Sequence, residues 1–169
     1  RHSRRRSVTP ALARWNGLSG EAAAEEMRAL CGSRVWARCV AGKRPLDSGE
    51  SLLAAAAACW DALPEGDRLE AFAAHPRIGD HRAAGAAAAE QAGVRGAGPE
   101  TIRALERANR EYEARFGRVF LVCASGKTAE EMLALCRQRL QNDPRVELEV
   151  ASAEQKKITA LRLQRWLAA

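Results

Sequence analysis

Two ionisable side chains occupy positions that are unusual for their residue types. His75 precedes Pro76, and a residue before proline is pushed out of helical geometry, so we expect His75 in a shaped loop. Histidine titrates close to neutral pH, which suits proton transfer. Glu90 lies in the last turn before Gly93, where the helix dipole disfavours a carboxylate by about 0.3–1 kcal/mol. Both are therefore candidates for acid–base chemistry; a loop histidine that bonds a helix end and a solvent-exposed glutamate are the alternative interpretations.

A third polar residue interrupts an apolar stripe. The helix expected over 99–115 carries its apolar side chains at Ile102, Leu105, Tyr112 and Phe116. Asn109 falls on this stripe, and a buried amide without hydrogen bonds costs about 1–3 kcal/mol. The pattern favours a structural amide that ties down nearby backbone, with a role in a functional site as the alternative.

The elements that position these residues are predicted to be helical. Apolar residues make up 47% of the 169-residue chain and charged residues 28%, a globular balance. Abundant alanine and sparse β-branched residues favour helix over strand. Helices are expected over 20–31, 33–41, 48–63, 64–74, 82–92, 99–115 and 128–141, with a last one from 143 onward. Only 119–123 could be extended, and one strand makes no sheet.

We therefore expect an all-α fold, a single-domain helical bundle of about 8–10 helices. Residues 1–10 are expected to form a basic, disordered tail and residues 11–169 the helical domain. The formal net charge of the whole chain is +6, and four arginines lie within residues 1–6. The rest of the chain therefore has 23 basic residues against 21 acidic ones. A nucleic-acid partner is thus not expected, although an arginine arm that binds phosphates is the alternative.

The cysteines favour a reducing compartment. The chain has five cysteines, and no two of them lie at C-x-x-C spacing. A zinc site or a disulfide scaffold is therefore not expected, and the cysteines are predicted to be small buried side chains. No apolar run approaches the roughly 20 residues that cross a bilayer. We expect no metal, no membrane partner and a cytoplasmic location.

Short blocks of this sequence form a collinear pattern. They are AHPRIG at 74–79, EQAG at 90–93, NREY at 109–112 with FG at 116–117 and FLVCA at 120–124, SGK at 125–127 with EEM at 130–132, and KITALRL at 157–163. In order and spacing, from about residue 11 to 167, these blocks resemble the OHCU decarboxylase family, where OHCU is 2-oxo-4-hydroxy-4-carboxy-5-ureidoimidazoline.

The resemblance implies an all-helical, cofactor-free and commonly homodimeric enzyme of urate degradation that converts OHCU to (S)-allantoin. It implies that His75 and Glu90 are catalytic. The substrate contacts that it implies are Pro76, Gln91, Phe120, Leu121, Val122, Cys123, Ala124 and Arg162. Ala87 belongs to the same set, at a position where the family usually has a serine, so weaker binding is expected. Hand-over of OHCU from the preceding 5-hydroxyisourate hydrolase is left open.

Three other interpretations remain. A relative with lost or altered activity would explain Ala87. A nucleic-acid-binding helical module would explain the arginine-rich start. A purely structural helical protein would leave the placement of Glu90 without a reason.

Overall fold

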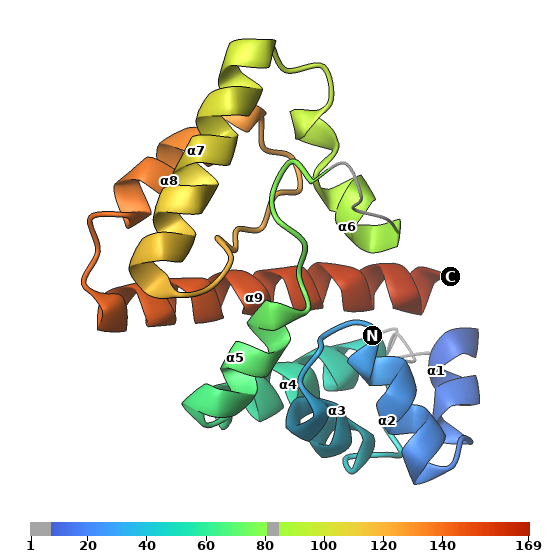
Figure 1. The fold of residues 1–169 in the computed structure, drawn as a ribbon. Helices are drawn as coiled ribbons and strands as arrows, with labels where there is room; N and C mark the ends of the chain where they lie inside the picture. Colours follow the sequence, from blue (N-terminus) through green and yellow to red (C-terminus); the bar gives the residue numbers. More distant parts are fainter. Residues whose placement is uncertain (1–7, 81–84) are drawn as a thin grey trace, which may run out of the picture. The chain divides into compact units, whose positions relative to one another are not determined.

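A computed structural model describes residues 8–80 and 85–169, and this part of the chain is helical and contains no strand (Figure 1). The all-α prediction is confirmed. The helices are α1 (Pro10–Asn16), α2 (Gly20–Arg28), α3 (Arg34–Ala41), α4 (Gly49–Asp61), α5 (Glu65–Ala73), α6 (Gly85–Glu90), the 3₁₀ turn η1 (Ala92–Val94), α7 (Pro99–Phe116), α8 (Ala129–Arg139) and α9 (Pro144–Ala168). The arginine-rich residues 1–6 and His81 lie outside the described residues.

The chain divides into two compact units. The first contains the described residues up to Ala71 together with Ile158–Ala169, and the second runs from Phe72 to Lys157. The long helix α9, red in Figure 1, therefore gives its N-terminal part to the second unit and its C-terminal part to the first.

The first unit is built on capped helices and buried tryptophans. The side chains of Ser19, Ser33 and Ser48 each accept a hydrogen bond from a backbone N–H in the first turn of α2, α3 and α4, which satisfies donors that a helix start leaves open. Trp15 and Trp36 are fully buried, and their indole N–H groups donate to backbone carbonyls. The large aromatic surfaces are thus buried without an unpaired polar atom.

Helix α1 was not expected from the sequence. Thr9 accepts a hydrogen bond from Leu12 N, and Pro10 occupies the first turn, a standard start for a helix. This signal lies next to the arginine-rich start, within the residues 1–10 that were assigned to the tail. Ordered structure therefore begins within the segment assigned to the tail.

The expectation for the cysteines was wrong for one pair. Cys39 of α3 and Cys59 of α4 form a disulfide, with Cα atoms 5.9 Å apart, a separation typical of this bond. The other three are free and buried, as expected. A separation of 20 residues gives no local spacing signal; the packing of α3 against α4 creates the pair.

The second unit packs α7 beside α8 (Figure 1). α7 starts at Pro99 and ends at Gly117, whose φ of 72° is a left-handed conformation that glycine adopts without strain. α8 opens with the predicted capping box, in which Thr128 and Glu131 bond each other's backbone N–H. The run 119–123 between the helices forms no strand, and residues 120–124 are buried.

A buried ionic network holds the backbone of the run 119–123. Arg139 is 5% exposed and Glu147 0%, and the Arg139 Nη2 atom lies 2.5 Å from Glu147 Oε1. The Tyr112 hydroxyl donates to Glu147 Oε1, and Arg139 Nη1 donates to the Leu121 carbonyl over 2.6 Å. Tyr112 is fully buried; burial, and then its bond to Glu147, raise the pKa of its phenol. The network thus anchors the predicted substrate-binding segment to α7, α8 and α9.

Candidate functional site

His75 lies two residues after the end of α5, in the loop that the His-Pro pair predicts. Its ring Nε2 lies 2.6 Å from Oε1 of Gln155, a fully buried residue of α9. Sequence reasoning missed Gln155, because a glutamine within a helix carries no local signal of a contact made 80 residues away.

Two side-chain amides hold the backbone of this loop. Asn109 Nδ2 donates to the Ile78 carbonyl over 2.9 Å, so the prediction of a structural amide is confirmed. Gln91 Oε1 accepts the Gly79 N–H over 2.9 Å, and Gly79 has a φ of 85°, which suits glycine. Gln91 was predicted to contact substrate; here its amide oxygen shapes the loop that carries His75.

Glu90 is the last residue of α6 and is 8% exposed, so the solvent-exposed alternative is wrong. The turn that follows Glu90 approaches the backbone of another loop very closely. A Cβ atom on Gly93 would lie 1.9 Å from the Lys127 carbonyl oxygen, far inside van der Waals contact. Only a residue without a side chain fits there, and this contact seats the end of α6 against the loop after 120–124.

The segment 120–124 is held by charged side chains as well as by burial. Cys123 N–H donates to Glu154 Oε1 over 3.2 Å, and Lys127 Nζ donates to the Cys123 carbonyl over 2.6 Å. Lys157 Nζ donates to the second Glu154 oxygen over 2.6 Å. Both backbone groups of Cys123 therefore already have partners within the protein.

The pKa of the Cys123 thiol is raised, and nearby charges contribute to its shift. Burial raises its pKa, Lys127 opposes that rise, and the carboxylates of Glu154 and Glu90 raise it further. Of these charges, that of Glu90 has the smallest effect on the pKa of the Cys123 thiol. Glu90, Gln91 and the run 120–124 all belong to the second unit, and their role in a site stays a prediction.

The remaining predicted contacts lie in two places. Pro76 and Ala87 are both half-buried, in the second unit. Arg162 belongs to the first unit, where its Nη1 donates to the Leu30 carbonyl over 3.1 Å. The site described here is built from the second unit alone.

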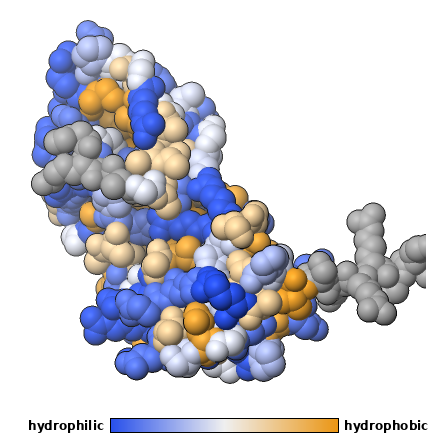
Figure 2. Space-filling view, turned by 90° about the vertical axis from the view of Figure 1, so that its right-hand side faces the viewer, coloured by the Kyte–Doolittle hydropathy of each residue, from blue (hydrophilic) through white to orange (hydrophobic). Residues whose placement is uncertain are grey.

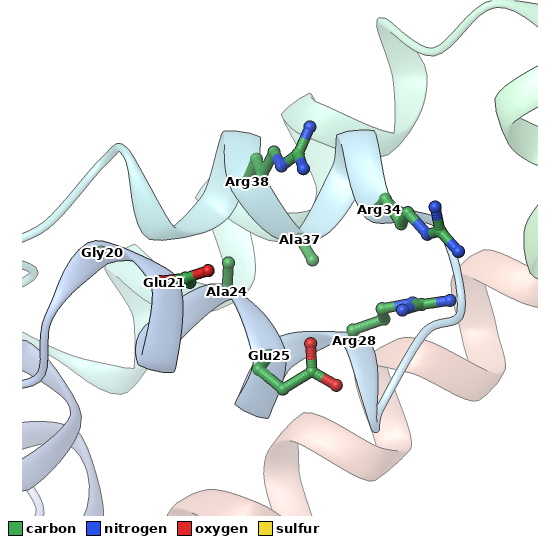
Figure 3. A pocket seen from close by; sticks show the side chains of 8 residues that line it. All are labelled: Gly20, Glu21, Ala24, Glu25, Arg28, Arg34, Ala37 and Arg38. Atoms are coloured by element: carbon green, nitrogen blue, oxygen red, sulfur yellow. The ribbon is translucent and has the colours of Figure 1, made fainter.

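Two surface grooves lie in the described part of the chain, and the first borders the loop that carries His75. One, of about 350 Å³, is lined by Arg77, Ile78, Gly79, Asp80, Glu106, Asn109 and Arg110. The other, of about 480 Å³, lies between α2 and α3 in the first unit. Figure 3 shows its floor of Ala24 and Ala37, with Arg34 and Arg38 on α3 and Glu25 on α2. Neither groove is lined by His75 or Glu90, so neither carries the predicted chemistry.

The arrangement can move protons in a largely buried setting. A histidine held by a buried amide, and a buried carboxylate, are the types of group that acid–base catalysis uses. Charges buried around Cys123 act more strongly than they would in water, because the local dielectric is low. In the described residues, no helix is long and apolar enough to span a membrane, and no cluster of three or more histidine, cysteine, aspartate or glutamate residues could hold a metal ion.

Comparison with known proteins places these residues in a family. The family described as OHCU decarboxylase matches residues 16–164. The uric acid degradation bifunctional protein TTL of Arabidopsis thaliana is 35% identical over 154 residues, 86% of this chain and 48% of that protein. The 2-oxo-4-hydroxy-4-carboxy-5-ureidoimidazoline decarboxylase of Amia calva is 34% identical over 77% of this chain and 78% of its own length. This chain thus spans about half of the first relative and most of the second.

Solved structures agree with the sequence matches. A crystal structure of OHCU decarboxylase in the presence of (S)-allantoin superposes with a TM-score of 0.77 at 34% identity, over 86% of this chain and 99% of that one. A structure of (S)-allantoin synthase shares the fold, with a TM-score of 0.72 at 18% identity over 92% of this chain and 53% of that one. The chain belongs to the OHCU decarboxylase family.

Proposed function

We propose that this chain decarboxylates OHCU to (S)-allantoin and CO₂ in urate degradation. The observation that carries the proposal is the presence, in one unit, of a loop histidine held by Gln155, of a buried glutamate at the end of α6 and of the buried segment 120–124. The relatives named for OHCU decarboxylation and uric acid degradation support it.

The proposed chemistry suits a site of positioned acid–base groups. In OHCU one carbon bears both a hydroxyl and a carboxylate, and the neighbouring carbon, which carries the ureido group, is double-bonded to a ring nitrogen. When the bond to the carboxylate breaks, its electrons flow towards that C=N bond, so the substrate is its own electron sink. The hydroxyl proton must leave, the ring nitrogen of the former C=N bond must gain a proton, and the neighbouring carbon must gain a proton on one face; the one net proton comes from solvent.

His75 is the proposed relay for the hydroxyl proton. Glu90 orients the substrate or the histidine, and its burial keeps water from competing. Positioned acid–base groups typically contribute about 10²–10⁴-fold each. The backbone groups of Cys123 and the carbonyls of Leu121 and Ala124 already have partners, so the other backbone groups of the segment 120–124 are the proposed contacts for the ureide group. A contact from Arg162 stays a prediction from the family resemblance.

The experiment is circular dichroism of freshly oxidised urate, in the presence of 5-hydroxyisourate hydrolase, with and without this protein. A fast rise of the (S)-allantoin signal supports the proposal. Slow formation of racemic product at the spontaneous rate would contradict it and favour a relative with altered specificity. The Ala87→Ser variant tests that alternative, since restoring one hydrogen bond should lower KM by the equivalent of about 0.5–1.5 kcal/mol.

Two partner relationships belong to the proposal. A homodimer is expected from the family, and light scattering on the purified chain measures it directly. Among the described residues the large exposed apolar side chains are Val8, Val35, Leu69 and Val146. Figure 2 shows apolar residues on one face as small patches between hydrophilic ones. Hand-over of OHCU from the hydrolase predicts faster allantoin formation with both proteins together than from OHCU formed beforehand at the same concentration.

The cytoplasm is the proposed location, and the disulfide offers a test of it. Cytosolic reductants keep most thiols reduced. If the protein works in the cytoplasm, trapping thiols at lysis should find Cys39 and Cys59 reduced, with the bond forming only after purification. An oxidised pair at lysis would contradict a cytoplasmic location.

A further inference from the structure

The contact between His75 and Gln155 joins the predicted catalytic loop to α9. Gln155 is fully buried, and the 2.6 Å between the ring Nε2 and the amide Oε1 is a short hydrogen bond. The residue before it, Glu154, accepts the N–H of Cys123. Two successive residues of α9 thus hold the two segments that carry the predicted chemistry.

The chemical identity of these atoms restricts the protonation of the ring. An amide oxygen has lone pairs and no hydrogen, so it can only accept. The hydrogen of this bond must therefore lie on Nε2 of His75. In a neutral imidazole only one nitrogen carries hydrogen, which leaves Nδ1 as the nitrogen with the lone pair.

We propose that Gln155 is a positioning residue that selects the Nε2–H tautomer of His75 and so makes Nδ1 the atom that accepts the substrate's hydroxyl proton. This inference rests on the proposed decarboxylase function. The opposite tautomer would set two lone pairs against each other at 2.6 Å, beside the amide of the fully buried Gln155, whose oxygen would lose this hydrogen bond.

A neutral amide also suits a relay that must release its proton again. When Nδ1 takes the proton the ring becomes a cation, and its Nε2–H bond to Gln155 becomes charge-assisted and stronger. The amide stabilises that cation without itself taking a proton. Gln155 therefore fixes the orientation of the ring through both halves of the cycle.

The first test is spectroscopic and needs no substrate. Long-range ¹H–¹⁵N correlation of protein with ¹⁵N-labelled histidine distinguishes the two tautomers, and the His75→Asn variant identifies the signals of His75 against those of His2 and His81. We expect the Nε2–H tautomer in the parent protein, a mixture of tautomers in Gln155→Leu, and the parental tautomer in Gln155→Glu, which keeps an acceptor. An Nδ1–H tautomer in the parent, or no change in Gln155→Leu, would overturn the inference.

The second test is kinetic. Gln155→Leu should lower kcat by about 10-fold or more, part of the ~10²–10⁴-fold that a positioned acid–base group contributes, while KM changes little. Gln138→Leu, at an exposed position of α8, is the matched control and should keep parental kinetics. Gln155→Met replaces the leucine variant if the latter does not fold, as checked by thermal unfolding. A rise in KM at unchanged kcat would overturn the positioning role.

The two proposals fail in different ways. If the parent protein makes no (S)-allantoin but shows the Nε2–H tautomer, with loss of that preference in Gln155→Leu, the proposed function is wrong and the positioning stands. If the parent is an active decarboxylase and its tautomer is unaffected by Gln155→Leu, the function stands and this inference fails.

Discussion

The two units of this chain bury different kinds of side chain. Among the described residues of the first unit, the buried polar ones are Ser33, Ser48 and Thr159. In the second they are Glu90, Gln91, Asn109, Arg139, Glu147, Ser152, Glu154 and Gln155. Burying charged groups costs desolvation free energy that even good pairing only partly repays, so the second unit carries a cost that apolar packing would avoid. That cost coincides with the segments 75–79 and 120–124, which carry the predicted chemistry.

The largest expected effect comes from breaking the buried ion pair of the second unit. Glu147→Gln leaves Arg139 without its carboxylate, and losing one partner of a buried pair costs about 3–5 kcal/mol. Urea unfolding measures the loss. Glu106→Gln, an exposed change on α7, is the control and should stay within about 0.5 kcal/mol of the parent. Equal stability of the two variants would remove the contrast between the units.

A smaller effect is expected from cutting the disulfide of the first unit. A cross-link that closes about 20 residues stabilises by roughly 3 kcal/mol, mainly by restricting the unfolded chain. The Cys39→Ala/Cys59→Ala double variant should lower the free energy of unfolding by up to this amount. Hydrogen exchange should show the faster opening within residues 8–71. Faster exchange confined to the second unit would contradict the conclusion that the disulfide stabilises the first unit.

Gly93→Ala should disturb the site more than the fold. The new methyl group would overlap the Lys127 carbonyl, and overpacking of this kind costs about 1–3 kcal/mol. We expect lower kcat together with a lower midpoint of urea unfolding. Gly98→Ala is the matched control, because a Cβ there meets nothing within 4 Å. A fully active Gly93→Ala protein would show that the close approach is dispensable.

The smallest effect concerns the electrostatics around Cys123. The ammonium of Lys127 lowers the pKa of this thiol against the effect of burial, so Lys127→Met should raise it. The thiolate then forms at higher pH, and the pH midpoint of Cys123 alkylation, followed by peptide mass spectrometry, should move upward. Lys43→Met, an exposed change in the first unit, should leave the midpoint in place. A downward shift would mean that Lys127 mainly holds the loop closed.

The sequence allowed good prediction where signals are local. The capping box at Thr128 and the proline and glycine that bound α7 each act within one turn, so the helix boundaries followed from them. Asn109 was identifiable because an amide on an apolar stripe needs a partner.

Contacts between distant segments left no such signal. The bonds of Gln155 to His75 and of Glu154 to Cys123 join residues 80 and 31 positions apart. The requirement for glycine at position 93 comes from the backbone of Lys127, a partner that only the folded chain brings close. Sequence motifs therefore indicated which residues form the site, and the tertiary structure shows what holds them.

The most direct test of the central claim is the initial rate of (S)-allantoin formation by the His75→Ala variant, measured beside the parent protein and the Arg77→Ala variant of the same loop. The account predicts that His75→Ala loses about 10²–10⁴-fold in rate and yields racemic product while its far-ultraviolet spectrum stays helical. Arg77→Ala, which loses only an exposed pair with Glu113, should remain stereoselective. A His75→Ala protein that still makes (S)-allantoin at the parental rate would contradict the account.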